Sequence, residues 1–214
     1  SSKKGMSAHQ LHRMLGVTYK TAWFMAHRIR EAMLDTNPGP MGGLGGKVEA
    51  DETYIGRTDE ARKSGRKGPK SKMAVVSLVS GGKARTFHVK DANQKTVTKI
   101  IRENVHRATE LHTDESPIYS AVGKEMFRHR TVNHSAEEYV GSFGQTTNRV
   151  ENYFSVFKRG MRGIYQHCSE KHLARYLTEF DFRYNYRIKL GFNDADRALA
   201  IAKGIEGKRL TYRR

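Results

Sequence analysis

Three acidic residues occur at positions from which their side chains could act together on a phosphodiester bond. Asp51 lies in the middle of a β-like segment, 48–55, where a carboxylate disfavours strand formation and is costly to bury without a partner. Asp114 follows a second β-like segment, 110–113, and strand ends often hold ligands in α/β sheets. Taken singly, each aspartate also has an ordinary interpretation, as a solvated residue of an edge strand or as part of a turn.

The third acidic residue, Glu151, lies in a segment whose apolar residues recur with helical spacing. Val150, Phe154 and Phe157 form a stripe that predicts an amphipathic helix packed on a sheet. Lys158 follows Glu151 by two helical turns, so both side chains leave one face of the helix roughly 10 Å apart along its axis.

Both residues of this helix also have structural alternatives. Asn148 and Glu151 have the spacing of a capping box, in which Glu151 would only close the start of the helix. Lys158 precedes Gly160, and a cation near the C-terminus of a helix is favoured by the helix dipole.

The residue types, taken together, favour metal-assisted chemistry. Three carboxylates without Cys or His companions are hard oxygen ligands, which suit Mg²⁺ or Mn²⁺ rather than zinc. Two such ions ~3.5–4 Å apart would clamp the attacking and leaving oxygens of an in-line displacement at phosphorus. Lys158 would hold a neighbouring phosphate as a point charge.

The composition points to a polyanionic partner. Among 214 residues, Lys and Arg number 39 and Asp and Glu number 22, a formal net charge of +17 at pH 7. The charge is spread over several segments, which favours nucleic acid over an anionic membrane surface. No apolar run has the length of a membrane span. The single cysteine, Cys168, excludes an intrachain disulfide and an all-cysteine zinc site.

Residues 7–34 predict two helices joined by a glycine turn, the outline of a helix-turn-helix. Ser7 and Gln10 have capping-box spacing, Gly16 ends the first helix and Thr18 caps the second. The alternative is a helical hairpin packed on the main domain. We expect the second helix to bury Ala22, Ala26, Ile29 and Met33. Its DNA-facing side would carry Tyr19, Lys20, Thr21, His27 and Arg28.

The rest of the chain has a mixed α/β order. After a Pro/Gly-rich linker, 35–46, we expect strands over 48–55, 73–79, 84–89, 110–113 and 131–133, and helices over 97–105, from Ser116, and near 148–160, 169–187 and 193–204. This order predicts a mixed sheet flanked by helices. The domains expected are a helix-turn-helix segment, 1–34, the linker, a catalytic domain, 47–190, and a C-terminal helix with a basic tail, 191–214.

A basic segment lies between the first two expected strands. Residues 57–72 are polar and contain Gly but no aromatic residue, which predicts an exposed loop that neutralises DNA phosphates without reading sequence. The DNA contacts predicted are Arg57, Arg62, Lys63, Arg66, Lys67, Lys70 and Lys72, together with Lys158 and Arg159 of the later helix.

Four motifs resemble bacterial insertion-sequence transposases of the ISXO2-like group. They are Glu-Ala-Asp51-Glu-Thr-Tyr-Ile-Gly, His-Thr-Asp114-Glu, His134-Ser-Ala-Glu-Glu-Tyr-Val and Thr-Asn-Arg-Val-Glu151-Asn-Tyr-Phe-Ser-Val-Phe-Lys158-Arg-Gly. Similar stretches at 16–30, 171–185 and 207–212 extend the resemblance over nearly the whole chain. The resemblance implies a DDE-type catalytic domain of the ribonuclease-H-like fold, in which Asp51, Asp114 and Glu151 are the catalytic metal ligands.

The resemblance also implies an activity and its partners. Such a transposase cleaves transposon ends and transfers the strands into target DNA, using two Mg²⁺ or Mn²⁺ ions. Its partner would be double-stranded DNA in the bacterial cytoplasm, bound by a homodimer or higher oligomer, with no membrane. Because the third catalytic position of the family can be Glu, Asn or His, Asn148 is an alternative to Glu151, and His134 could assist proton transfer.

Two other functions fit the same residues: a metal-dependent nuclease of the same fold without strand transfer, and a non-catalytic helix-turn-helix DNA-binding regulator.

Family members usually carry a Cys-rich zinc ribbon before the helix-turn-helix. This chain has no such cysteines, so the resemblance leads us to expect an N-terminally truncated protein.

Overall fold

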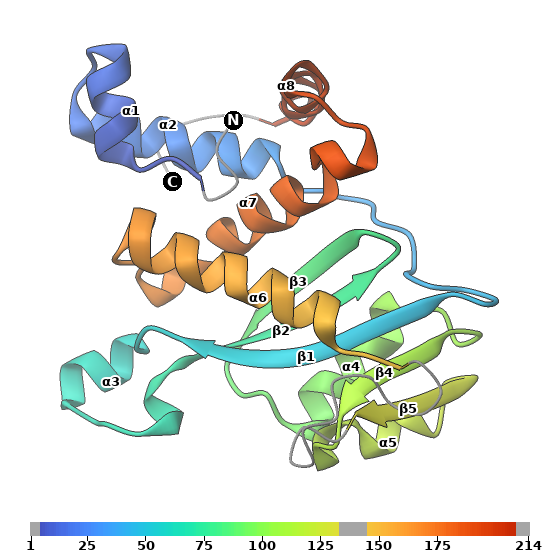
Figure 1. The fold of residues 1–214 in the computed structure, drawn as a ribbon. Helices are drawn as coiled ribbons and strands as arrows, with labels where there is room; N and C mark the ends of the chain where they lie inside the picture. The colour runs from blue at the N-terminus through green and yellow to red at the C-terminus, as the bar shows by residue number, and fades with distance from the viewer. Residues whose placement is uncertain (1–4, 133–144, 209–214) are drawn as a thin grey trace. The chain divides into compact units, whose positions relative to one another are not determined.

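The computed structural model describes residues 5–132 and 145–208. The chain forms two compact units, one of Pro38–Ser155 and one of Ser1–Asn37 with Val156–Arg214. Figure 1 shows the elements of both. Within the described residues, no helix combines the length and the apolar character needed to cross a membrane.

The unit Pro38–Ser155 is built on a five-stranded mixed sheet (Figure 1). Its strands are β1 (Lys47–Ile55), β2 (Met73–Ser80), β3 (Lys83–Val89), β4 (Glu110–Asp114) and β5 (Arg128–Val132). The strand order is β3-β2-β1-β4-β5. The first three strands are antiparallel hairpin neighbours, whereas β4 and β5 run parallel to β1. This is the mixed α/β sheet that the order of the elements in the sequence predicts.

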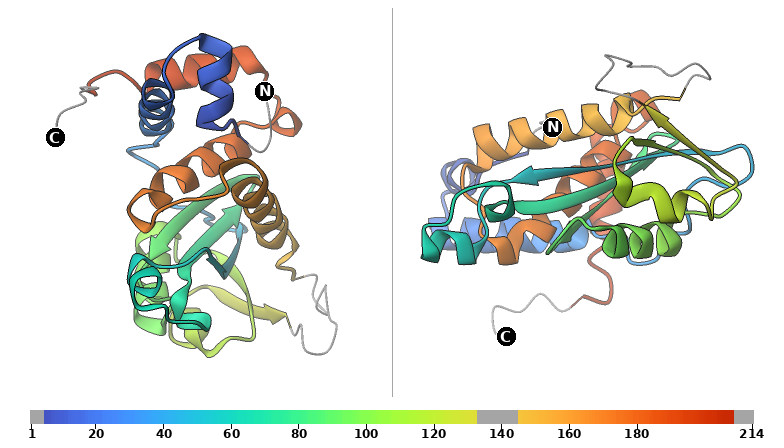
Figure 2. Two further views of the ribbon diagram at one scale, coloured as in Figure 1. Left: turned by 90° about the vertical axis from the view of Figure 1, so that its left-hand side faces the viewer. Right: turned by 90° about the horizontal axis from the view of Figure 1, so that it is seen from below.

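Helices connect and flank the strands. They are α3 (Asp59–Ser64), α4 (Gln94–Asn104), α5 (Ser120–Gly123) and the first part of α6 (Asn148–Gly160), with short 3₁₀ turns at Pro69–Ser71 and Pro117–Tyr119. In the right-hand view of Figure 2, α4 and α5 lie on one side of the strands and the start of α6 on the other. The sheet is therefore covered by helices on both faces.

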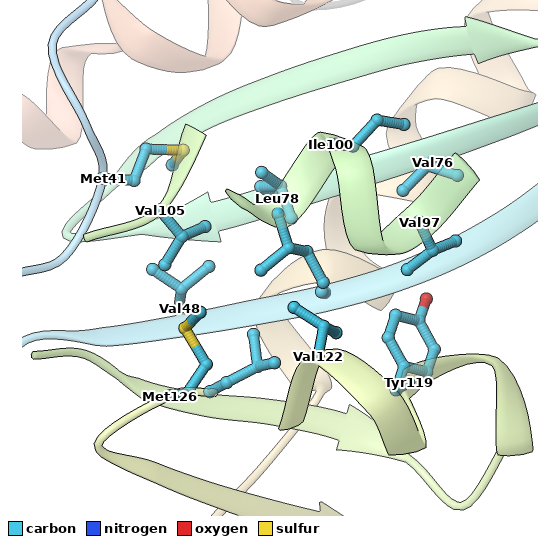
Figure 3. Packing of buried hydrophobic residues seen from close by; sticks show 13 residues of the cluster. Met41, Val48, Val76, Leu78, Val97, Ile100, Val105, Tyr119, Val122 and Met126 are labelled. Carbon is cyan, nitrogen blue, oxygen red and sulfur yellow. The ribbon is translucent and has the colours of Figure 1, made fainter. Parts of the chain in front are cut away.

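One face of the sheet carries the apolar core. Alternate side chains of β1, including Val48 and Ala50, pack with α4 and α5 (Figure 3). The cluster contains Met41, Val48, Ala50, Val76, Leu78, Val97, Ile100, Ile101, Val105, Leu111, Tyr119, Val122 and Met126. Met41 lies in the segment predicted as a linker, yet its backbone N–H donates to Asn104 at 2.8 Å. Because side chains alternate along a strand, Glu49 and Asp51 point to the opposite face.

The other unit is helical. It contains α1 (Ala8–Leu15), α2 (Tyr19–Ala32), the end of α6, a π-helical turn (Met161–Tyr165), α7 (Leu173–Asn185) and α8 (Asp194–Lys203), with 3₁₀ turns at Glu170–His172 and Ile188–Leu190. Ser7 accepts the backbone N–H of Gln10, and Gly16 ends α1 with a φ of 65°. Thr18 caps α2 by accepting the N–H of Thr21. The two predicted N-terminal helices and their caps are thus confirmed.

The buried face of α2 differs from the prediction. Ile29, expected in the apolar stripe, is 39 % exposed, whereas His27 and Arg30 are 1 % and 4 % exposed. Arg30 Nε donates to Glu179 Oε2 of α7 at 2.8 Å, so the arginine is buried as one member of an ion pair. Burial, aided by the nearby positive charge of Arg30, lowers the pKa of His27 to about 3. The prediction that His27 lies on the exposed side is wrong.

The segment 57–72 is not a continuous loop. Thr58 caps α3 by accepting the N–H of Ala61, and Gly65 ends that helix with a φ of 71°. Arg57 Nη2 donates to the carbonyl of Ala61 at 2.9 Å and also to the carbonyl of Arg66. These contacts give the segment a defined turn of helix that its polar sequence did not predict.

Candidate active site

Two of the candidate carboxylates lie on neighbouring parallel strands. In the pairing of β1 with β4, Glu49 stands opposite His112. Asp51 and Asp114 follow two residues later on the two strands, on the same face. Asp114 is the last residue of β4, and its Oδ1 accepts the backbone N–H of Ser116 at 3.1 Å. Because adjacent strands are ~4.8 Å apart, this register brings the two aspartates side by side.

The third candidate, Glu151, lies in the first turn of α6. Its Oε1 accepts the hydroxyl proton of Thr147 at 2.6 Å, a contact within the same turn of chain. The helix begins at Asn148 itself, whose backbone N–H donates to the Thr146 hydroxyl at 3.0 Å. Asn148 is therefore not the cap of this helix, and the capping-box alternative for Glu151 is wrong.

The three carboxylates interact electrostatically. Burial, together with the negative charges of Glu52, Asp114 and Glu151, raises the pKa of Asp51 to about 7, against the lowering effect of the backbone N–H of Glu52. The charges of both other candidates thus act on Asp51. A buried carboxylate whose pKa is raised in part by neighbouring acids favours binding of a cation, which would relieve the repulsion.

To bind one metal ion, the acidic side chains would also have to lie close enough together to share it. In the described part of the chain, no three His, Cys, Asp or Glu side chains are arranged closely enough to hold a metal ion. The strands and helix position the acids as neighbours, and their donor chemistry is that of a Mg²⁺ or Mn²⁺ site.

A fourth acid, Glu52, adjoins the site from the other face of β1. The hydroxyl of Tyr119, a fully buried core residue, donates to Glu52 Oε2 at 2.7 Å. Burial raises the pKa of Glu52, and Asp114 raises it further, against the bond from Tyr119. Glu52 therefore adds negative potential near Asp51 while its own carboxylate is held by the core.

The remaining catalytic candidates are Lys158, Asn148 and His134. Lys158 lies in the last turn of α6, as its spacing from Glu151 predicts, and is half-buried. The boundary between the two units falls between Ser155 and Val156, inside this helix. Asn148 accepts a hydrogen bond from Asn152 Nδ2 through its backbone carbonyl, at 2.9 Å. His134 lies outside the described residues.

Glu49 lies on the same face of β1 as Asp51, although it was not among the candidate residues named from the sequence. Its Oε2 accepts the backbone N–H groups of Arg149 at 2.8 Å and Val150 at 3.1 Å, at the start of α6. The residue is only 3 % exposed. The signal that singled out Asp51, an acid in the middle of a strand on the polar face, applies equally to Glu49. The pattern did not say which element covers that face.

The basic segment after β1 surrounds a hollow of about 410 Å³. The hollow is lined by Gly56, Arg57, Lys67, Gly68, Ser71 and Lys72. Arg62, Lys63, Arg66, Lys67, Lys70 and Lys72 are exposed, as predicted, whereas Arg57 is half-buried by its bonds to two carbonyls. Positive side chains therefore gather around a concave surface there.

The expected DNA-facing residues of α2 divide into two kinds. Lys20 and Thr21, in its first turn, are exposed. Arg28 is half-buried, pairs with Glu31 at 2.5 Å and lies over the Phe24 ring, 4.9 Å from its centroid. Arg159, at the end of α6, is exposed. Of the expected DNA contacts in α2, the two in its first turn are thus open to a ligand.

Comparison with known proteins gives the family. No curated protein matches the chain. Among solved structures, a chain from the cryo-electron-microscopy structure of a simian T-cell lymphotropic virus intasome in complex with PP2A regulatory subunit B56 gamma is 13 % identical, with a TM-score of 0.37, over 99 % of this chain and 71 % of that chain. The family model of the ISXO2-like transposase domain matches residues 43–185, which include Asp51, Asp114 and Glu151. The chain belongs to the ISXO2-like transposase domain family.

Proposed function

We propose that this protein is a DDE-type DNA transposase that cleaves the ends of its element and transfers them into target DNA. The observation that carries the proposal is that the charges of Asp114 and Glu151 both act on the buried Asp51, in a domain of this family. Two come from adjacent parallel strands and one from a helix on the same face. Acids brought together from three elements fit a cation site better than three separate structural roles.

The donor set fits divalent ions. It consists of carboxylates alone, and Asp51 carries a raised pKa because it is buried and because neighbouring acids repel its charge. Mg²⁺ or Mn²⁺, bound here as a pair, would supply activation of a water or 3′-hydroxyl and stabilisation of the leaving oxygen. Asp51 and Asp114 would hold the ions from the sheet and Glu151 from α6. The Thr147 hydroxyl, which donates to Glu151, would orient that carboxylate.

The protein's other residues would bind and orient DNA. Lys158 would hold a phosphate near the third carboxylate, since it follows Glu151 by two turns of the same helix. The exposed cations of 57–72, next to a hollow, would hold the backbone of the duplex without reading its sequence. Lys20 and Thr21 at the start of α2 would contact DNA at a second place.

A two-stage DNA assay tests the function. The full chain is incubated with a plasmid that carries the ends of its own element, with Mg²⁺, with Mn²⁺ or with EDTA. We expect metal-dependent nicking at the ends, followed by joining of the 3′-OH to a second duplex. Nicking without joining would support the nuclease alternative. Binding without any metal-dependent nicking would contradict the proposal and favour the regulator.

A further inference from the structure

Glu49 and His112 lie opposite each other on β1 and β4, on the face that carries Asp51 and Asp114. Both are nearly inaccessible, at 3 % and 1 % exposure. A charged or polar side chain buried so fully in a sheet needs partners that satisfy it. Each of the two residues has a partner in one short stretch of chain, 146–150.

Glu49 binds the start of α6 directly. Its Oε2 accepts the backbone N–H of Arg149 at 2.8 Å and that of Val150 at 3.1 Å. These N–H groups belong to the first turn, where a helix has no carbonyl partners of its own. A carboxylate that accepts them is favoured by the helix dipole and forms charge-assisted hydrogen bonds. The ion pair of Glu49 with the Arg149 side chain is longer, at 3.8 Å, and that side chain is 58 % exposed.

His112 binds the chain just before the helix. Its Nδ1 accepts the backbone N–H of Thr146 at 3.3 Å. The opposite ring nitrogen, Nε2, then carries the proton and donates to Glu110 Oε1 at 2.8 Å. Arg130 Nε donates to that same oxygen at 3.0 Å, which anchors the chain of contacts on β5. The entry to α6 is therefore tied to β1 and β4 at adjacent positions.

We propose that Glu49 is a positioning residue that sets the place of Glu151, with His112 as its partner. Glu49 stands two residues before Asp51, and the N–H of Val150 that it binds belongs to the residue before Glu151. One strand thus carries the first carboxylate and also fixes the backbone that carries the third. The inference rests on the proposed metal-dependent function, because positioning matters only if the three acids share an ion.

The variants separate backbone positioning from charge. Glu49→Ala removes the carboxylate oxygen that accepts both N–H groups, and Glu49→Gln keeps one neutral oxygen that can still accept an N–H. Arg149→Ala is the matched control, since it removes the side-chain ion pair and leaves the backbone N–H in place.

The first readout needs no metal. Amide hydrogen exchange of the full chain is measured by NMR at Arg149 and Val150. We expect exchange at least about tenfold faster in Glu49→Ala, intermediate rates in Glu49→Gln and wild-type rates in Arg149→Ala. Wild-type exchange at both amides in Glu49→Ala would overturn the positioning role. If Glu49→Ala does not fold, the same comparison of Glu49→Gln with Arg149→Ala decides.

The second readout is the affinity for Mn²⁺ alone, measured by electron paramagnetic resonance. Residues that orient metal ligands typically change affinity by about 10–100-fold, so we expect a loss of this size in Glu49→Ala and a smaller one in Glu49→Gln. Unchanged affinity despite faster exchange would contradict an effect on Glu151. If the wild-type protein binds no Mn²⁺, the proposed metal-dependent function fails, and the exchange rates still decide whether Glu49 holds α6.

Discussion

Asp51 and Asp114 occupy matching positions on two adjacent parallel strands, each two residues beyond the pair formed by Glu49 and His112. The antiparallel hairpins on one side of β1 and the parallel strands on its other side make this possible. An acid in the middle of β1 and an acid at the end of β4 thereby become neighbours, although 62 residues of chain lie between them. Their place on the polar face directs both toward the side where α6 begins.

Substitution of either aspartate should remove catalysis and spare DNA binding. Asp51→Asn and Asp114→Asn each remove a charged metal ligand of the proposed site, while the basic surfaces stay unchanged. We expect a loss of at least about 100-fold in Mg²⁺-dependent cleavage, with a dissociation constant for DNA within about threefold of the wild type. Glu115→Gln, the same change at the exposed next residue, is the control. Near-normal cleavage by either Asn variant would refute the metal site.

The metal-free protein should lose stability as the pH rises. The pKa of Asp51 is raised to about 7 in the folded state and is about 3.9 in an unfolded chain, so the folded state binds more protons between these values. The proton on Asp51 therefore adds to the free energy of unfolding in full below about pH 4, and this contribution is lost progressively up to about pH 7. In EDTA, Asp51→Asn should unfold at a higher temperature than the wild type at pH 8, and the difference should shrink toward pH 4. If the melting temperatures of the two proteins differed by the same amount at every pH in this range, the raised pKa of Asp51 would be contradicted.

The segment 57–72 should bind DNA phosphates without reading sequence. Each lost phosphate contact flattens the plot of log K against log salt by ~0.9 on duplex DNA. The triple variant of Arg66, Lys67 and Lys70 to Ala should therefore reduce this slope by about two to three units, for specific and random duplexes alike. A matched triple variant of the exposed Lys90, Lys95 and Lys124 should keep the slope. An unchanged slope in the first variant would shift the DNA contact to α2.

The buried pair of Arg30 and Glu179 should hold the helical unit together. Their side chains are 5 % and 6 % exposed, and the Arg30 guanidinium also lies 4.2 Å from the Tyr176 ring centroid. Glu179→Ala leaves a buried charge without its partner, which typically costs about 3–5 kcal/mol. The free energy of unfolding, measured with urea, should fall by that amount. The double variant with Arg30→Met should recover part of it, and equal loss in both variants would contradict the pairing.

Elements with clear apolar periodicity could be predicted from the sequence. β1, β2 and β3, and the helix with Val150, Phe154 and Phe157, lie where their patterns place them. β5 begins at Arg128, before the expected 131, because its first residues, Arg-His-Arg, give no apolar signal. Helix α3 was missed because the Thr58 cap and the Arg57 contacts hold it rather than a long apolar stripe.

Side-chain partners distant in the chain could not be predicted. Arg30 is polar in sequence and was not expected in the buried stripe of α2, yet Glu179, 149 positions later, allows its burial. Glu49 is a second example, since tertiary packing brings to it the Arg149 and Val150 amides that donate to its carboxylate. Periodicity tells which face of an element is polar, but it does not tell what that face contacts. The candidate acids could be named from the sequence, and the support of α6 by Glu49 could not.

The central claim is that Asp51, Asp114 and Glu151 share divalent ions. The most direct measurement is a crystal structure of the full chain soaked in Mn²⁺, with anomalous diffraction used to locate the ions. We expect Mn²⁺ bound by carboxylate oxygens of all three residues, at about 2.0–2.2 Å, the range for a small divalent ion. Mn²⁺ held by Asn148 with Glu151 turned away would transfer the third role. Mn²⁺ bound only elsewhere on the protein would refute the shared metal site.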